Sequence, residues 1–156
     1  MNSVYDPQGP ISLVGEALGI DLVLDTNGNC AFTFDQVHRV DIRFDKGKTF
    51  ALRAELSSLS GDAARMAAAL ELNVDPEMAA HRRLGYCPQE DRLVLIGHVD
   101  VTGKDPQADA EAIAGEVLFA AEVVERIAKA AGGSRRRAED TAPETPDDLD
   151  VHFIQV

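Results

Sequence analysis

Strand-like patterns dominate the first third of the chain. Segments rich in β-forming residues, most of which alternate apolar and polar positions, occur at 20–25, 30–34, 40–44 and 50–56. Side chains of a strand point to opposite faces in turn, so Phe32 and Phe34 fall on one face. Asn27-Gly28, between the first two segments, is typical of a hairpin turn. The pattern predicts an antiparallel meander with one apolar face.

Helical spacing of apolar residues appears over residues 10–18, 62–72 and 106–131. The first helix is expected to begin with Pro10 and to end at Gly19. The second is capped by Ser60 or Asp62. Its apolar stripe comprises Ala63, Met66, Ala67 and Leu70. The third has Asp105 as N-cap and is expected to stop at the Gly132-Gly133 pair.

A second pair of strands is predicted at 83–87 and 93–99, joined by a turn. The run from Leu93 to Ile96 is continuously apolar, which is typical of a strand covered on both faces. We take the order of elements to be α-β-β-β-α-β-β-α, which counts three strands among the four strand-like segments between the first two helices. Antiparallel strands separated by helices predict an α+β fold with the helices packed on the sheet.

The length of 156 residues suits one domain, which we expect to span residues 1–131. Residues 132–156 differ in character, because charged residues and prolines replace the apolar pattern. We expect this stretch to be an acidic, largely disordered tail. Its last residues, 151–156, are strand-like again.

Charge and hydropathy exclude several classes of partner. A net charge of −12 opposes a phosphate backbone, so we expect no nucleic-acid binding. No apolar run is long enough to cross a bilayer, and the first residues lack the features of a signal peptide, so we expect a cytoplasmic protein without membrane insertion. Cys30 and Cys87 are expected to be small apolar residues rather than a disulfide or a metal site.

No local pattern indicates catalysis. The sequence lacks a nucleophile elbow and a glycine-rich phosphate loop, and its four histidines lack metal-ligand spacing. We therefore expect no enzyme, no cofactor and no metal. An enzyme would need a site assembled by the fold alone.

The strands between Leu22 and Leu56 carry more large apolar residues than their length requires. If the helices cover the sheet only in part, an apolar strip stays open for a partner. If they cover it fully, all of these residues are core. The sequence leaves both possibilities open.

Several short runs together resemble the Tir-chaperone (CesT-like) class I type III secretion chaperones. They are Leu13–Ile20 with its Leu-Gly ending, Leu22-x-Leu24-Asp25-x-Asn27-Gly28-x-Cys30, Phe34-Asp35, Leu70-Glu71-Leu72-Asn73, Leu84-Gly85 and Leu93-Val94-Leu95. The similarity covers roughly residues 8–131. It rests on the order of apolar positions, the length and the acidic character, and no single motif is diagnostic.

The resemblance implies a cytoplasmic bacterial homodimer that catalyses no reaction. Such a chaperone binds the N-terminal chaperone-binding segment of a secreted effector, keeps it soluble, partly unfolded and export-competent, and releases it at the secretion ATPase. Carried onto this chain, the effector-binding positions are Leu13, Leu22, Leu24, Phe32, Phe34 and Ile42. The dimer-interface positions are Ala63, Met66, Ala67, Leu70, Leu93 and Leu95.

Other functions stay open at this point. One is a protein-binding adaptor or immunity module unrelated to secretion, and another is a small α+β ligand-binding domain or enzyme. The tail beyond Gly132 is a departure from the family pattern, because it is longer than these chaperones need. Its last residues, 151–156, either dock on a sheet edge, in their own or a neighbouring subunit, and protect the effector groove, or are an idle flexible end.

Overall fold

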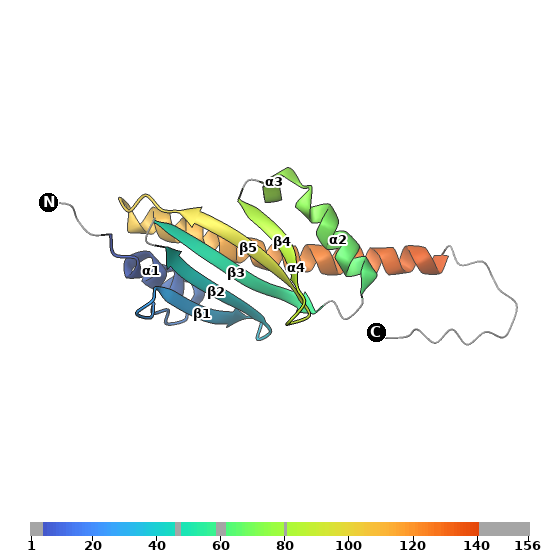
Figure 1. The fold of residues 1–156 in the computed structure, drawn as a ribbon, viewed down its shortest axis with the longest axis horizontal. Coiled ribbons are helices and arrows are strands. Elements are labelled where there is room, and N and C mark those ends of the chain that lie inside the picture. Colours follow the sequence, from blue (N-terminus) through green and yellow to red (C-terminus); the bar gives the residue numbers. More distant parts are fainter. Residues whose placement is uncertain (1–4, 46–47, 59–61, 80, 141–156) are drawn as a thin grey trace, which may run out of the picture.

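A five-stranded antiparallel sheet forms one layer of the protein, and helices form the other. The computed structural model describes residues 5–45, 48–58, 62–79 and 81–140. The strand order is β1-β2-β3-β5-β4, and every neighbouring pair is antiparallel. Figure 1 shows α4 running behind the sheet along its length and past its end. The predicted α+β class with helices packed on the sheet is confirmed.

The strands lie close to their predicted positions. They are β1 (Asn29–Phe34), β2 (His38–Asp45), β3 (Thr49–Ser58), β4 (Arg82–Cys87) and β5 (Arg92–Asp100). The register pairs Ile42 with Leu52 and Leu52 with Gly97, which places alternate residues of neighbouring strands on the same face. These strands could be predicted because one face of each is buried, so that apolar and polar residues alternate along them.

Segment 20–25 is not a strand, contrary to the prediction. It runs beside α1 (Gln8–Leu18), and the Gln8 side chain makes the hydrogen bonds that a neighbouring strand would make. The Gln8 amide donates from Nε2 to the carbonyl of Leu22 at 2.9 Å and accepts from the backbone N–H of Leu24 at 2.9 Å. The β-forming residues of this segment are thus satisfied without joining the sheet.

Helix α1 begins at Gln8, before the predicted start at Pro10, and ends before Gly19 as predicted. Pro10 still lies in the first turn, where a missing N–H costs no helical bond. Gly19 has φ 70°, which favours glycine. Gly15 lets the chain return tightly, since a Cβ there would lie 2.6 Å from the carbonyl oxygen of Ile20.

Helix α2 (Ala63–Asn73) is followed by a single turn, α3 (Pro76–Ala79). Asp62 caps α2 as predicted, and its carboxylate accepts from the Arg65 N–H at 3.2 Å. The predicted stripe is not the buried face of this helix. Its buried residues are Ala68, Ala69 and Leu72.

Helix α4 (Pro106–Asp140) begins as predicted, with the Asp105 carboxylate accepting from the Gln107 N–H at 3.0 Å. It does not stop at Gly132-Gly133 but continues to Asp140. Glycine weakens a helix by only about 1 kcal/mol per residue, which the flanking helix formers can offset. Leu118 lies on the side of α4 away from the core and is 65% exposed. Residues 141–156, which hold the rest of the predicted tail, lie outside the described residues.

The core lies between the sheet and the helices. Phe50, Ile42, Leu56, Ile113 and Val123 are fully buried there. In the described part of the chain, all helices lie on this one side, so the other face of the sheet carries no helical layer. The expectation that Leu93–Ile96 is covered by structure on both faces is therefore wrong, although Val94 is buried between its neighbouring strands.

Two ion pairs fix α4 to the neighbouring elements. The Arg82 guanidinium donates to the buried Glu116 carboxylate at 2.6 and 2.8 Å and lies 3.9 Å over the ring of Phe119. The Arg126 guanidinium donates to Asp75 at 2.7 Å, beyond the end of α2. The Arg82–Glu116 pair, whose carboxylate is buried, fixes the position of the helix, because separating it leaves a charge without a partner.

Candidate protein-binding surfaces

The predicted effector-binding residues all lie on or around α1, β1 and β2, but they differ in accessibility. Leu22 and Ile42 are buried inside the chain, so their side chains are not on its surface. Four others are half-buried and pack against the core at one end of the sheet: Leu13, Leu24, Phe32 and Phe34. Four of the six predicted residues are therefore partly accessible at the surface, and the other two belong to the core.

Two exposed apolar residues that were not predicted from the sequence lie in the same region. Val23 is 63% exposed and Ile20 is exposed as well, both in the segment that follows α1. Val23 follows the buried Leu22, and the extended backbone turns these successive side chains to opposite sides. We call Ile20, Val23, Leu24, Phe32 and Phe34 the α1 surface. Strand β1 is an edge of the sheet, since among the described strands it pairs with β2 alone.

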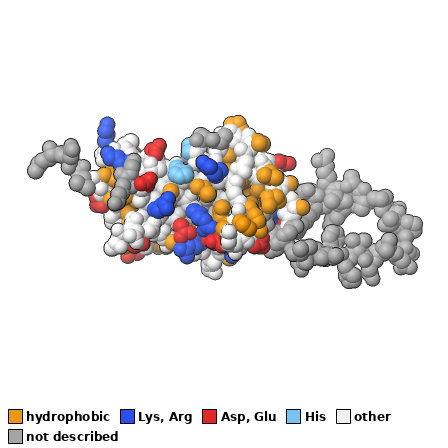
Figure 2. All heavy atoms as spheres, in the orientation of Figure 1, with side chains coloured by type: hydrophobic (Ala, Val, Ile, Leu, Met, Phe, Trp, Pro, Cys, Tyr) orange, Lys and Arg blue, Asp and Glu red, His pale blue; other side chains and the backbone are white. Residues whose placement is uncertain are grey.

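A second apolar surface follows one side of α2. Ala63, Ala67, Leu70 and Val74 recur at the spacing of one helical face, and all four are exposed. Leu70 is 61% and Val74 is 81% exposed. We call these four residues the α2 stripe. In Figure 2, hydrophobic side chains gather over the end of the molecule that carries α2 and β4.

The α2 stripe contains three of the predicted dimer-interface residues. A fourth, Met66, is half-buried against the core. Leu93 and Leu95 lie beneath the helices and are fully covered within one chain, so their side chains are not available to a partner. Their apolar character is explained by the core of the single chain.

The α2 stripe is held in place by hydrogen bonds at the end of the helix. Asn73 donates from Nδ2 to the carbonyl of Leu84 at 3.0 Å and accepts from the Leu84 N–H at 2.8 Å. These bonds tie the end of α2 to the edge strand β4. A rigidly placed apolar stripe is suited to a partner of fixed shape, such as a second copy of the helix.

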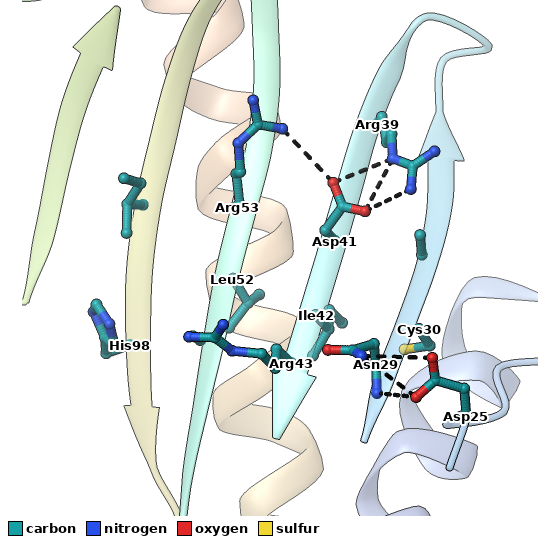
Figure 3. A pocket seen from close by; sticks show the side chains of 13 residues that line it. Asp25, Asn29, Cys30, Arg39, Asp41, Ile42, Arg43, Leu52, Arg53 and His98 are labelled. Atoms are coloured by element: carbon teal, nitrogen blue, oxygen red, sulfur yellow. Dashed lines mark hydrogen bonds and ion pairs between the residues drawn. The ribbon is translucent and has the colours of Figure 1, made fainter. Parts of the chain in front are cut away.

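The third surface is a trough of about 630 Å³ on the face of the sheet opposite the helices. Ala31, Ala51 and Ile96 form part of its apolar lining. Figure 3 shows Arg39 and Arg53 converging on Asp41 between them, while Arg43 reaches across β3 towards His98. Arg39 donates to Asp41 at 2.7 and 2.9 Å.

Acidic and thiol groups at one end of this trough are structural. Asp25 accepts from the backbone N–H groups of Asn29 and Asn27, which lowers the pKa of its carboxyl group. Burial raises the pKa of the Cys30 thiol to about 11, with the nearby charges of Asp25 and Asp41 adding to the effect. Cys30 is therefore almost entirely protonated at neutral pH and is not an activated nucleophile.

Two further observations concern chemistry and membranes. Within the described ranges, no cluster of histidine, cysteine or carboxylate side chains is arranged to hold a metal ion. The helices of those same ranges include none that is long and apolar enough to cross a bilayer.

The residues that position these surfaces were not predictable from the sequence. Gln8, Asn73 and the Arg82–Glu116 pair make contacts between residues 11 to 34 positions apart. Of these, only Asn73 carried a signal, as the end of the Leu-Glu-Leu-Asn run. Polar residues are common on helices and strands, so their long-range partners cannot be predicted from spacing alone.

Comparison with known proteins places the chain in a family. The sequence description of the Tir chaperone protein (CesT) family matches residues 11–122, which include every residue of the three surfaces. No curated protein matches the chain significantly.

Solved structures share the fold at low sequence identity. A HopA1–SchA chaperone–effector complex matches with TM-score 0.52 at 16% identity over 76% of this chain and 92% of the other. The Yersinia pestis type III secretion chaperone SycH, solved with a fragment of YscM2, matches with TM-score 0.53 at 16% identity over 73% and 96%. YbjN from E. coli, described as a putative transcription regulator, matches with TM-score 0.53 at 14% identity over 84% and 96%. At these identities the likeness concerns the fold alone.

Proposed function

The chain belongs to the Tir chaperone protein (CesT) family, and from this premise we propose that it is a type III secretion chaperone that binds the N-terminal chaperone-binding segment of an effector. The observation that carries the proposal is the family match over residues 11–122. The exposed apolar residues on that same region give the proposal a physical basis, because a chaperone of this kind acts through binding surfaces.

The α1 surface is the proposed site for the effector segment. Its exposed and half-buried apolar side chains offer contacts to an extended peptide, and the neighbouring edge of β1 offers backbone hydrogen bonds. Strand addition of this kind combines main-chain affinity with pockets for alternate side chains. An effector held in extended form cannot complete its own fold, which keeps it export-competent.

The α2 stripe is the proposed interface between two subunits. Exposed leucine and valine side chains on a helix that is fixed at its end favour burial against an identical helix. A twofold arrangement places the same stripe on both sides of the interface. We infer that the protein is a homodimer with an effector-binding surface on each subunit.

The proposed role also implies a mode of action, a location and a further partner. The chaperone acts by binding rather than by catalysis, in the bacterial cytoplasm, and hands its effector to the secretion ATPase. The net charge of −12 keeps a protein with open apolar surfaces soluble.

Co-expression tests the proposed function. The candidate effector is the secreted protein encoded beside the gene of this chain, produced in a bacterial host with and without the chaperone. We expect the effector to be insoluble or degraded alone and to be recovered in a soluble complex with the chaperone. An effector that gains no solubility and forms no complex would contradict the proposal.

A further inference from the structure

The two edges of the sheet differ in what their backbone groups bind. Strands β1 and β4 are the edge strands, because among the described strands each pairs with a single neighbour. An edge strand presents N–H and C=O groups that can pair with a strand from another chain. Figure 1 shows α2 beside β4, whereas β1 lies at the opposite edge. The hydrogen bonds at each edge indicate where a strand can be added.

The edge of β1 is open at Ala31 and Thr33. The Asn29 N–H donates to the Asp25 carboxylate at 2.9 Å and the Asn29 carbonyl accepts from the Asp25 N–H at 2.8 Å, so both groups point away from β2. Alternate residues of a strand direct their backbone groups to the same side, so those of Ala31 and Thr33 also point away from β2. Both residues are exposed, and within the described ranges these groups have no partner.

Segment 20–24 does not cover this open stretch. Its backbone is bonded by the Gln8 side chain, which accepts from the N–H of Leu24 and donates to the carbonyl of Leu22. The chain then meets β1 at the bonds between Asp25 and Asn29. These bonds limit the open edge on one side, and the remainder of β1 is accessible to a partner strand.

The edge of β4 is closed near its middle by Asn73. The Asn73 amide donates to the Leu84 carbonyl at 3.0 Å and accepts from the Leu84 N–H at 2.8 Å. A strand added to β4 would need these two groups, because Leu84 directs them away from β5. Asn73 is the last residue of α2, and Asp75 just beyond it is ion-paired with Arg126 of α4 at 2.7 Å. The blocking side chain is thus held by two helices.

We propose that Asn73 is a positioning residue that confines strand addition to residues 31–33 of β1 by closing the opposite edge of the sheet. The inference rests on the proposed function, because the added strand is the effector segment. It adds the register, in which the effector pairs with the backbone groups of Ala31 and Thr33 beside the half-buried rings of Phe32 and Phe34. Each subunit then accepts one strand, and subunits do not join through their β4 edges.

A matched pair of prolines tests which edge accepts the effector. Thr33→Pro on β1 and Tyr86→Pro on β4 each remove an N–H on the outer side of an edge strand and leave the bonds to the inner strand in place. In a titration of the labelled N-terminal effector segment, we expect Thr33→Pro to weaken binding at least about tenfold. Tyr86→Pro should bind as the unmodified chain does. Equal effects of the two prolines would overturn the proposal.

The closure of β4 is tested on the chain alone. We expect Asn73→Ala to form assemblies that are larger than the unmodified protein and grow with concentration, because the backbone groups of Leu84 become available to a second β4 edge. Sedimentation velocity measures their size. Adding Tyr86→Pro to this variant should restore the size of the unmodified protein, which would not happen if the loss of Asn73 merely loosened α2.

Two results of this second measurement would overturn the proposal. One is an Asn73→Ala variant of unchanged size, and the other is a larger assembly that persists when Tyr86→Pro is added. Because no effector is present, the result does not depend on the proposed function. If the unmodified chain binds no effector segment, the proposed function fails and the sedimentation measurement alone decides whether Asn73 closes the β4 edge.

Discussion

At the scale of single residues, two amide side chains do the work of strand partners. Gln8 binds the carbonyl of Leu22 and the N–H of Leu24, and Asn73 binds both backbone groups of Leu84. An amide side chain carries one donor group and one acceptor, so it matches the pair of backbone groups that an edge presents. In both cases a helix is fixed to a neighbouring segment without an added strand.

The change Gln8→Ala tests this role. Two partly buried backbone groups lose their partner, so we expect the free energy of unfolding to fall by about 1–3 kcal/mol. Urea unfolding followed by circular dichroism measures the change. Gln107→Ala is the control, because the exposed Gln107 side chain donates to its helical neighbour Glu111 and the substitution keeps the backbone N–H that Asp105 caps. A fall for Gln8→Ala no larger than that of the control would show that segment 20–24 is held by other contacts.

At the scale of elements, periodicity predicted the strands that bury one face. It did not predict the elements whose structure depends on contacts with residues far away in the sequence. The strands were readable because Ile42, Leu52 and their neighbours alternate with polar residues. Segment 20–25 was misread because its composition matches a strand, while a side chain from another helix satisfies its backbone. Helix α4 was predicted too short, since two glycines weaken a helix without forcing it to end.

The two stripes of α2 illustrate the same limit. Apolar residues occur on both sides of this helix, and the sequence cannot tell which side faces the core. The structure buries Ala68, Ala69 and Leu72 and leaves Leu70 and Val74 exposed. The exposed stripe is therefore the side of α2 that no described part of the same chain buries.

The double change Leu70→Glu with Val74→Glu tests the α2 stripe as a subunit interface. Four buried carboxylates across a twofold axis would repel each other, so we expect a dimer to become a monomer with little loss of stability. Light scattering after gel filtration measures the mass in solution. Leu118→Glu, on a similarly exposed leucine of α4, should leave the dimer intact. An unchanged dimer in the double variant would place the interface elsewhere.

At the scale of the whole molecule, one layer of helices leaves the sheet with two different faces. The helix side holds the core and, at its two ends, the α1 surface and the α2 stripe. The other side holds the arginine-lined trough. The large apolar residues of the first strands thus lie partly in the core and partly on open surface. Neither a wholly buried set nor a wholly open strip describes all of them.

The candidate sites were only partly predictable for the same reason. Phe32 and Phe34 kept some exposure because β1 is an edge strand, whereas Ile42 one strand further in is covered. Strand order decides this difference, and strand order is a long-range property. Val23 escaped notice because its exposure depends on segment 20–25 leaving the sheet.

The central claim is that the α1 surface binds an effector segment, and a titration tests it most directly. Purified chain is titrated into a fluorescently labelled N-terminal segment of the effector, using the unmodified protein, Val23→Glu and the control Leu118→Glu. We predict that Val23→Glu weakens binding at least about tenfold, equal to roughly 1.4 kcal/mol, while Leu118→Glu binds as the unmodified chain does. Binding that is absent from the unmodified chain, or unaffected by Val23→Glu, would contradict the account.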